Sequence, residues 1–89
     1  MSDDQETLFE FPCEYPVKAM GRAAVGLEDI VFNLIKRHAP ELRHEDIQTK
    51  PSSGGKYISV TATITATSKA QLDSLYLELS GHPDILMAF

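Results

Sequence analysis

At 89 residues, with 43% hydrophobic and 24% charged residues, the chain has the composition of one small globular domain and leaves no room for a second core. Its single cysteine, Cys13, excludes an intrachain disulfide and favours a reducing compartment. The net charge of −5 resides in the first 14 residues, because the eight acidic and eight basic residues from Tyr15 onward cancel. A neutral body lacks the basic surface on which non-specific nucleic-acid binding depends.

The N-terminal segment is acidic and has none of the features of a membrane signal. A secretory signal peptide is basic and then apolar, and Ser2 occupies the position at which myristoylation requires glycine. The apolar runs of the chain are far shorter than the roughly 20 residues that span a bilayer. We therefore expect a cytoplasmic protein with an acidic leader over residues 1–13, partly disordered or docked, and a single domain over residues 14–89.

A first strand is predicted over residues 15–22, where apolar and polar positions alternate. It should start at or after Pro16, because proline fits poorly inside a central strand. Large apolar side chains cluster in the leader just before it, so we expect Phe9 or Phe11 to pack against the body.

From Leu27 the apolar period becomes that of an amphipathic helix. The stripe consists of Leu27, Ile30, Val31, Leu34, Ile35 and His38. Acidic residues near its start and basic residues near its end suit the helix dipole. Pro40 ends the helix, because the residue before a proline is disfavoured in the α region.

A β-hairpin is predicted next, formed by a short polar strand over residues 47–52 and a longer strand over residues 57–67. The turn signal Ser53-Gly54-Gly55 lies between them. The longer strand alternates cleanly, with an apolar face and an open face rich in threonine, as expected for a half-buried strand.

Ser68 and Gln71 form a capping-box pattern that opens a second helix. Gly81 is expected to end it in the left-handed conformation. The apolar run over residues 85–89 is then predicted to be a last strand.

The order β-α-β-β-α-β predicts a ferredoxin-like α+β fold, with a four-stranded antiparallel sheet in the order 4-1-3-2 and both helices on one face. An unrelated α+β meander is the alternative, and the lengths and order of the elements favour the ferredoxin-like fold.

Several segments resemble the YbeD family of small bacterial cytosolic proteins of unassigned biochemical function, and the likeness covers nearly the whole chain. They are Lys18-Ala19-Met20-Gly21, Arg37-His38-Ala39-Pro40, and Lys50-Pro51-Ser52-Ser53 with Gly55, Tyr57, Ser59 and Val60. The resemblance implies a fold similar to ACT regulatory domains, which bind small effectors and pair side by side. It implies no active site.

No catalytic, metal or cofactor site is predicted. Residues 50–56 look like a phosphate-binding loop, but Lys56 leads into a strand rather than a helix. A hairpin turn is favoured, and a weak anion site formed by turn amides, Lys50 and Lys56 is the alternative. The histidines and Cys13 lack the spacing of zinc ligands, and no base stands near Cys13 to activate it.

The last strand is unusual because it is an edge strand that is apolar on both faces and uncharged. Edge strands are normally protected by lysine or proline, as Lys50 and Pro51 protect the opposite edge. Either Phe9 or Phe11 covers this edge, or it pairs with a second copy or another protein. Both interpretations stay open.

The favoured hypothesis is a non-enzymatic regulatory or adaptor domain that binds a small effector or a protein partner. Its candidate surface comprises Lys18, Arg22, His38, Lys50, Ser52, Ser53, Tyr57, Ile85 and Met87. The alternative is an enzyme or metabolite-handling protein with an unrecognised site, and it predicts a pocket formed by Lys18, Arg22, His38 and Lys50. RNA binding is disfavoured, because the open face offers Tyr57 and then threonines in place of the stacked aromatics of RNA-binding sheets.

Overall fold

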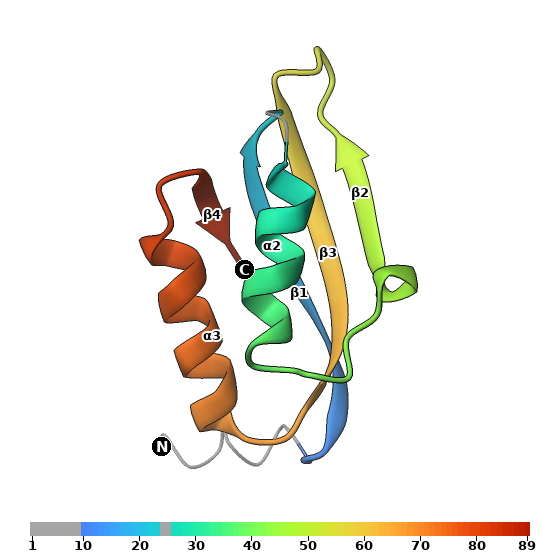
Figure 1. The fold of residues 1–89 in the computed structure, drawn as a ribbon, viewed down its shortest axis with the longest axis vertical. Coiled ribbons are helices and arrows are strands. Elements are labelled where there is room, and N and C mark those ends of the chain that lie inside the picture. Colours follow the sequence, from blue (N-terminus) through green and yellow to red (C-terminus); the bar gives the residue numbers. More distant parts are fainter. Residues whose placement is uncertain (1–9, 24–25) are drawn as a thin grey trace.

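The computed structural model describes residues 10–23 and 26–89, which form one antiparallel sheet covered by helices on one side (Figure 1). The strands are β1 (Cys13–Arg22), β2 (Ile47–Pro51), β3 (Tyr57–Ala66) and β4 (Ile85–Ala88). The helices are α2 (Leu27–Lys36), the short 3-10 helix η1 (His44–Asp46) and α3 (Lys69–Gly81). In these ranges the sheet has the order β2-β3-β1-β4. The predicted ferredoxin-like α+β fold is confirmed.

The hydrophobic core lies between the helical layer and one face of the sheet. The sheet contributes alternate residues of its two central strands, and the helices contribute one stripe each. The fully buried side chains include Val17, Val31, Ile35, Leu42, Val60, Leu75 and Leu79. Phe11 packs against this core, as expected of Phe9 or Phe11, whereas Phe9 lies outside the described residues. Across the described part of the chain, no helix combines the length and the apolar character that crossing a membrane requires.

The start of α3 follows the sequence signal, and its end does not. Ser68 is the N-cap, and its hydroxyl accepts a hydrogen bond from the Gln71 amide at 3.0 Å. The prediction that Gly81 adopts the left-handed conformation is wrong, because its φ is not positive and the helix continues through it. The helix ends at His82, whose extended backbone is the conformation that the following Pro83 favours.

Strand β1 begins at Cys13, so the prediction that it starts at or after Pro16 is wrong. Lys18 exchanges both backbone hydrogen bonds with Phe89, each at 2.7 Å, so its amide and carbonyl point toward the β4 side of β1. The backbone nitrogen and carbonyl of Pro16 point to the same side, because the direction of the backbone polar groups alternates from residue to residue along an antiparallel strand. The paired region of β4 does not extend as far as Pro16, so the missing N–H removes no bond from the β1–β4 ladder.

Candidate functional site

Most of the candidate residues lie on the open face of the sheet, the face opposite the helices. Val17 and Ala19 of β1 face the core, so Lys18, Met20 and Arg22 face the other side. Met20 lies opposite Ser59 of β3, and Ser59 lies opposite Lys50 of β2. These three residues form one row across the sheet.

A second row lies next to the first, at the end of the sheet where the β2–β3 hairpin projects (Figure 1). Arg22 lies opposite Tyr57, and the Ser52 amide donates to the Tyr57 carbonyl at 2.8 Å. The Tyr57 amide in turn donates to the Ser52 hydroxyl at 3.2 Å. The Ala23 amide donates to the Lys56 carbonyl at 2.8 Å, which ties the end of β1 to the hairpin turn.

Two shallow depressions share the side chain of Tyr57. One, of about 310 Å³, is lined by Lys50, Ser52, Ser53 and Tyr57 together with Met20, Pro51, Ile58 and Ser59. The other, of about 330 Å³, is lined by Arg22, Lys56 and Tyr57. Among the residues that the structure describes, no carboxylate lines either depression. We call Arg22, Lys50, Ser52, Ser53, Lys56 and Tyr57 the hairpin-end surface.

The structure therefore brings five of the candidate residues together, and it adds Lys56, which the candidate set omitted. The sequence had indicated Lys56 only in the alternative of a weak anion site, which combines it with Lys50 and the turn amides. Lys18 lies on the same face, further along β1, with its ammonium group 5.6 Å from the centre of the Phe89 ring.

His38 lies away from this surface, in the helical layer. Its Nε2 donates a hydrogen bond to the Glu78 carboxylate at 2.6 Å, and its carbonyl accepts one from the Gln71 side chain at 2.8 Å. The hydrogen bond from His38, assisted by the charge of Arg37, lowers the pKa of Glu78. His38 thus links the end of α2 to α3, and the four residues that the enzyme hypothesis expects in one pocket are not together.

The two candidates of β4 differ in their surroundings. Ile85 is buried in the core, whereas Met87 is 54% exposed and lies opposite Met20 on the open face. Between them, Leu86 is 50% exposed at an irregularity in the β1–β4 pairing. Phe11 precedes β1 at the end of the strand remote from β4, so it does not cover Met87. The terminal edge is therefore apolar and exposed.

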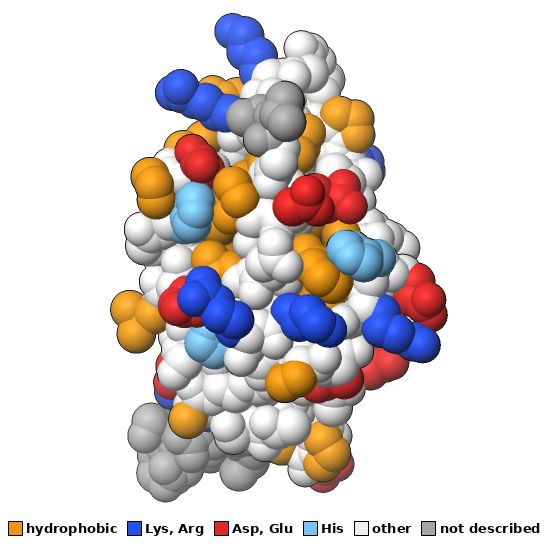
Figure 2. All heavy atoms as spheres, in the orientation of Figure 1, with side chains coloured by type: hydrophobic (Ala, Val, Ile, Leu, Met, Phe, Trp, Pro, Cys, Tyr) orange, Lys and Arg blue, Asp and Glu red, His pale blue; other side chains and the backbone are white. Residues whose placement is uncertain are grey.

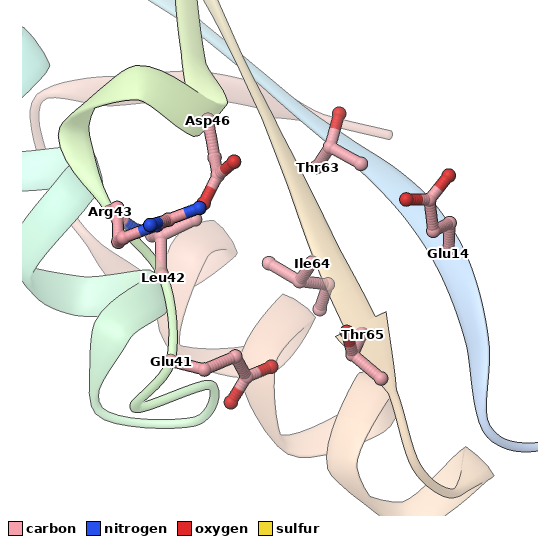
Figure 3. Close-up of a pocket in the computed structure, with 8 residues that line it drawn as sticks. All are labelled: Glu14, Glu41, Leu42, Arg43, Asp46, Thr63, Ile64 and Thr65. Carbon is pink, nitrogen blue, oxygen red and sulfur yellow. The ribbon is translucent and has the colours of Figure 1, made fainter.

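A third depression, of about 350 Å³, lies at the other end of the sheet, between the η1 region and the strands β1 and β3. Its acidic side chains, Glu14, Glu41 and Asp46, stand at separate positions around it (Figure 3). Asp46 accepts a hydrogen bond from the Arg43 amide at 3.0 Å, which stabilises the short helix. Within residues 10–23 and 26–89, no three His, Cys, Asp or Glu side chains form a group that could hold a metal ion.

Tyr76 of α3 carries a buried hydroxyl close to Tyr15 of β1. Burial, and next the neighbouring Tyr15, raise the pKa of Tyr76 well above its usual value. The native state therefore holds the phenol proton of Tyr76 more tightly than the unfolded chain, in which a tyrosine has a pKa of about 10. The stabilising contribution is complete below that pH and is lost as the pH rises through the native pKa.

We expect the free energy of unfolding to fall more steeply above about pH 10 in the wild type than in Tyr76→Phe, which has no phenol to titrate at this position. Urea unfolding followed by circular dichroism, at about pH 9 and about pH 11, measures the difference. Equal losses in the two proteins would show that Tyr76 does not contribute to alkaline sensitivity.

The chain matches known proteins over nearly its whole length. The family model described as "Protein of unknown function (DUF493)" matches residues 6–89. A UPF0250 protein of Chromobacterium violaceum is 44% identical over 87 residues, which cover 98% of each chain. A UPF0250 protein of Nitrosomonas europaea is 41% identical over 83 residues, which cover 93% of this chain and 95% of the relative.

A solved structure has the same fold. The solution structure of the C-terminal domain of the MgtC protein from Mycobacterium tuberculosis matches with a TM-score of 0.68 and 26% identity, covering 91% of this chain and 87% of that chain. The sequence relatives and the family model each match nearly the whole chain. The chain therefore belongs to the DUF493 family, the YbeD-like UPF0250 proteins of unknown function.

Proposed function

We propose that the protein is a non-enzymatic regulatory or adaptor domain that works in the cytosol by pairing its terminal edge strand, β4, with the same strand of a second copy. The observation that supports this proposal is the exposed apolar character of β4, which has no charged residue. Monomeric domains normally protect such edges, since an unpaired strand exposes backbone N–H and C=O groups with which another chain can pair.

The backbone of β4 is oriented for such pairing. Phe89 directs its amide and carbonyl to Lys18 of β1. Because polar groups alternate along an antiparallel strand, the amide and carbonyl of Ala88 point away from the sheet. Leu86 and Met87 precede this position with apolar side chains that are half exposed. A second β4 running antiparallel can satisfy the backbone groups and bury these side chains.

The opposite edge of the sheet is less suited to pairing. Strand β2 ends in Lys50 and Pro51, both exposed. A lysine charge and a proline, which has no N–H, both discourage strand addition. The two edges therefore differ, and the proposal assigns association to β4. Symmetric pairing of one edge closes at a dimer rather than an open fibre.

Met87→Lys is expected to convert a dimer into a monomer, because it places a charge beside the paired edge. Light scattering coupled to size-exclusion chromatography should give about twice the chain mass of 9.9 kDa for the wild type and the mass of one chain for the variant. Leu77→Lys is the matched control, since it makes the same change at a residue of α3 that is 74% exposed.

Two results would contradict the proposal. A wild type that is monomeric at high micromolar concentration would show that β4 does not pair with a second copy. A variant Met87→Lys that keeps the mass of a dimer would show that association uses another surface. If the wild type is monomeric yet retains one protein from cell extract that Met87→Lys fails to retain, the adaptor would act on a different protein instead of itself.

A further inference from the structure

The basic side chains of the described residues fall into two groups that differ in their partners. Those of the helical layer all have an acidic side chain or a carbonyl as partner. They are Lys36, Arg37, Arg43 and Lys69. On this side of the molecule acidic and basic side chains are interspersed (Figure 2), so most of the positive charge is neutralised locally.

The basic residues of the sheet and its hairpin are different. In the part of the chain that the structure describes, three of these side chains form neither an ion pair nor a hydrogen bond, namely those of Arg22, Lys50 and Lys56. On the open face the nearest acidic position along β1 is Glu14, which pairs with Thr65 at the opposite end of the strand. The neutral charge balance of the body therefore conceals a segregation, with unneutralised positive charge at the hairpin end.

These three charges surround one aromatic side chain. Arg22 and Lys56 line one depression, Lys50 lines the other, and Tyr57 lines both. Tyr57 is 38% exposed and offers an apolar surface between the charges. Ser52 and Ser53 line the depression with Lys50, and their hydroxyls are hydrogen-bond donors.

We propose that the hairpin-end surface binds a small multivalent anion, a metabolite that carries phosphate groups or several carboxylates. Basic side chains that lack an acidic partner gain the most electrostatic stabilisation from such a ligand. Guanidinium and ammonium groups bind both phosphate and carboxylate oxygens. Depressions of about 310 and 330 Å³ lie at the lower end of the range for small-molecule sites.

The side chains of the open face favour a compact ligand over a nucleic acid. Single-stranded nucleic acids need a series of aromatic side chains on which successive bases stack. Beyond Tyr57 the open face of β3 continues with Ser59, Thr61 and Thr63. A single aromatic beside three charges suits a compact ligand. The inference does not depend on pairing of β4, because none of the hairpin-end residues belongs to that strand.

The test is a titration of the ¹⁵N-labelled full chain with pyrophosphate and, separately, with citrate, at low ionic strength. The amides of Arg22, of Lys50 and of residues 52–57 are expected to shift in a saturable way with at least one of these anions. Lys50→Gln/Lys56→Gln should weaken binding by about tenfold, because the variant removes two of the three exposed charges that face the ligand. The control Arg37→Gln/Lys69→Gln removes the same charge from the helical layer and should change the affinity by less than about twofold.

The relative affinity for the two probes assigns the ligand to phosphates or carboxylates. Equal weakening by the two double variants would overturn the proposal, since the affinity would then depend on the overall charge of the protein and not on the hairpin-end surface. The proposal would equally fail if neither small anion shifted these amides while a single-stranded oligonucleotide or an acidic peptide did. Added salt should weaken the specific binding, because all the charges are exposed to solvent.

Discussion

Leu75→Ala is expected to lower the free energy of unfolding by about 2–5 kcal/mol, the usual range for truncating a fully buried leucine. Leu75 has no exposed surface and lies at the centre of α3, between the helix and the sheet. A domain this small has a total stability near the lower end of the range for folded proteins, roughly 5 kcal/mol. The variant should therefore keep no more than about 3 kcal/mol of stability, and at the upper end of the expected loss it would be partly unfolded without denaturant.

Urea unfolding followed by circular dichroism measures this change, because the chain contains no tryptophan for fluorescence. Leu77→Ala, two residues further along the same helix, is the control: Leu77 is 74% exposed, and its truncation should change stability by no more than about 0.5 kcal/mol. Similar losses at the two positions would mean that α3 does not pack through Leu75.

The fold was largely predictable because its elements depend on local periodicity. The apolar residues of α2 recur at helical spacing, and four of them, Leu27, Val31, Leu34 and Ile35, are buried as expected. The alternation in β3 likewise matches its buried and exposed positions. Such patterns are fixed by the geometry of one element, so the sequence alone contains them.

The errors arose where a second element decides the outcome. Pro16 is acceptable within β1 because the pairing of β4 ends before reaching it, which the sequence of β1 does not reveal. Gly81 remains helical because the helix is ended one residue later, by the extended backbone of His82, so no left-handed residue is needed at Gly81. The histidine on the helical stripe, His38, binds Glu78, forty residues later in the chain, and so belongs to the helix interface instead of the candidate surface.

The candidate site was only partly predictable for the same reason. Its cations come from β1, β2 and the hairpin turn, and only the register of the sheet brings them to one end. The count of charges suggested a neutral body, but a count contains no information about which layer holds each charge. Local ion pairs in the helical layer leave the positive charge of the sheet unneutralised.

Gly21→Ala is expected to destabilise the fold by about 1–3 kcal/mol, as overpacking usually does. Gly21 lies within β1, opposite Ile85 of β4. A Cβ at this position would clash with the Asp84 carbonyl oxygen and would stand 2.9 Å from the Leu27 side chain. The leucine can shift, but the carbonyl belongs to the backbone that leads into β4, so relief of the clash must displace that strand.

The same substitution at Gly81 provides a control of opposite sign. Gly81 lies in the last turn of α3 without a positive φ, and a Cβ there would meet no atom within 4 Å. Alanine is better than glycine inside a helix by roughly 0.5–1 kcal/mol, so Gly81→Ala should stabilise the protein slightly. Urea midpoints of the two variants separate the effects: a loss at Gly21 with a gain at Gly81 identifies the close approach of the Asp84 carbonyl as the cause. If Gly21→Ala were neutral, the contact between β1 and the segment before β4 would be looser than the structure shows, and the terminal edge would be free to move.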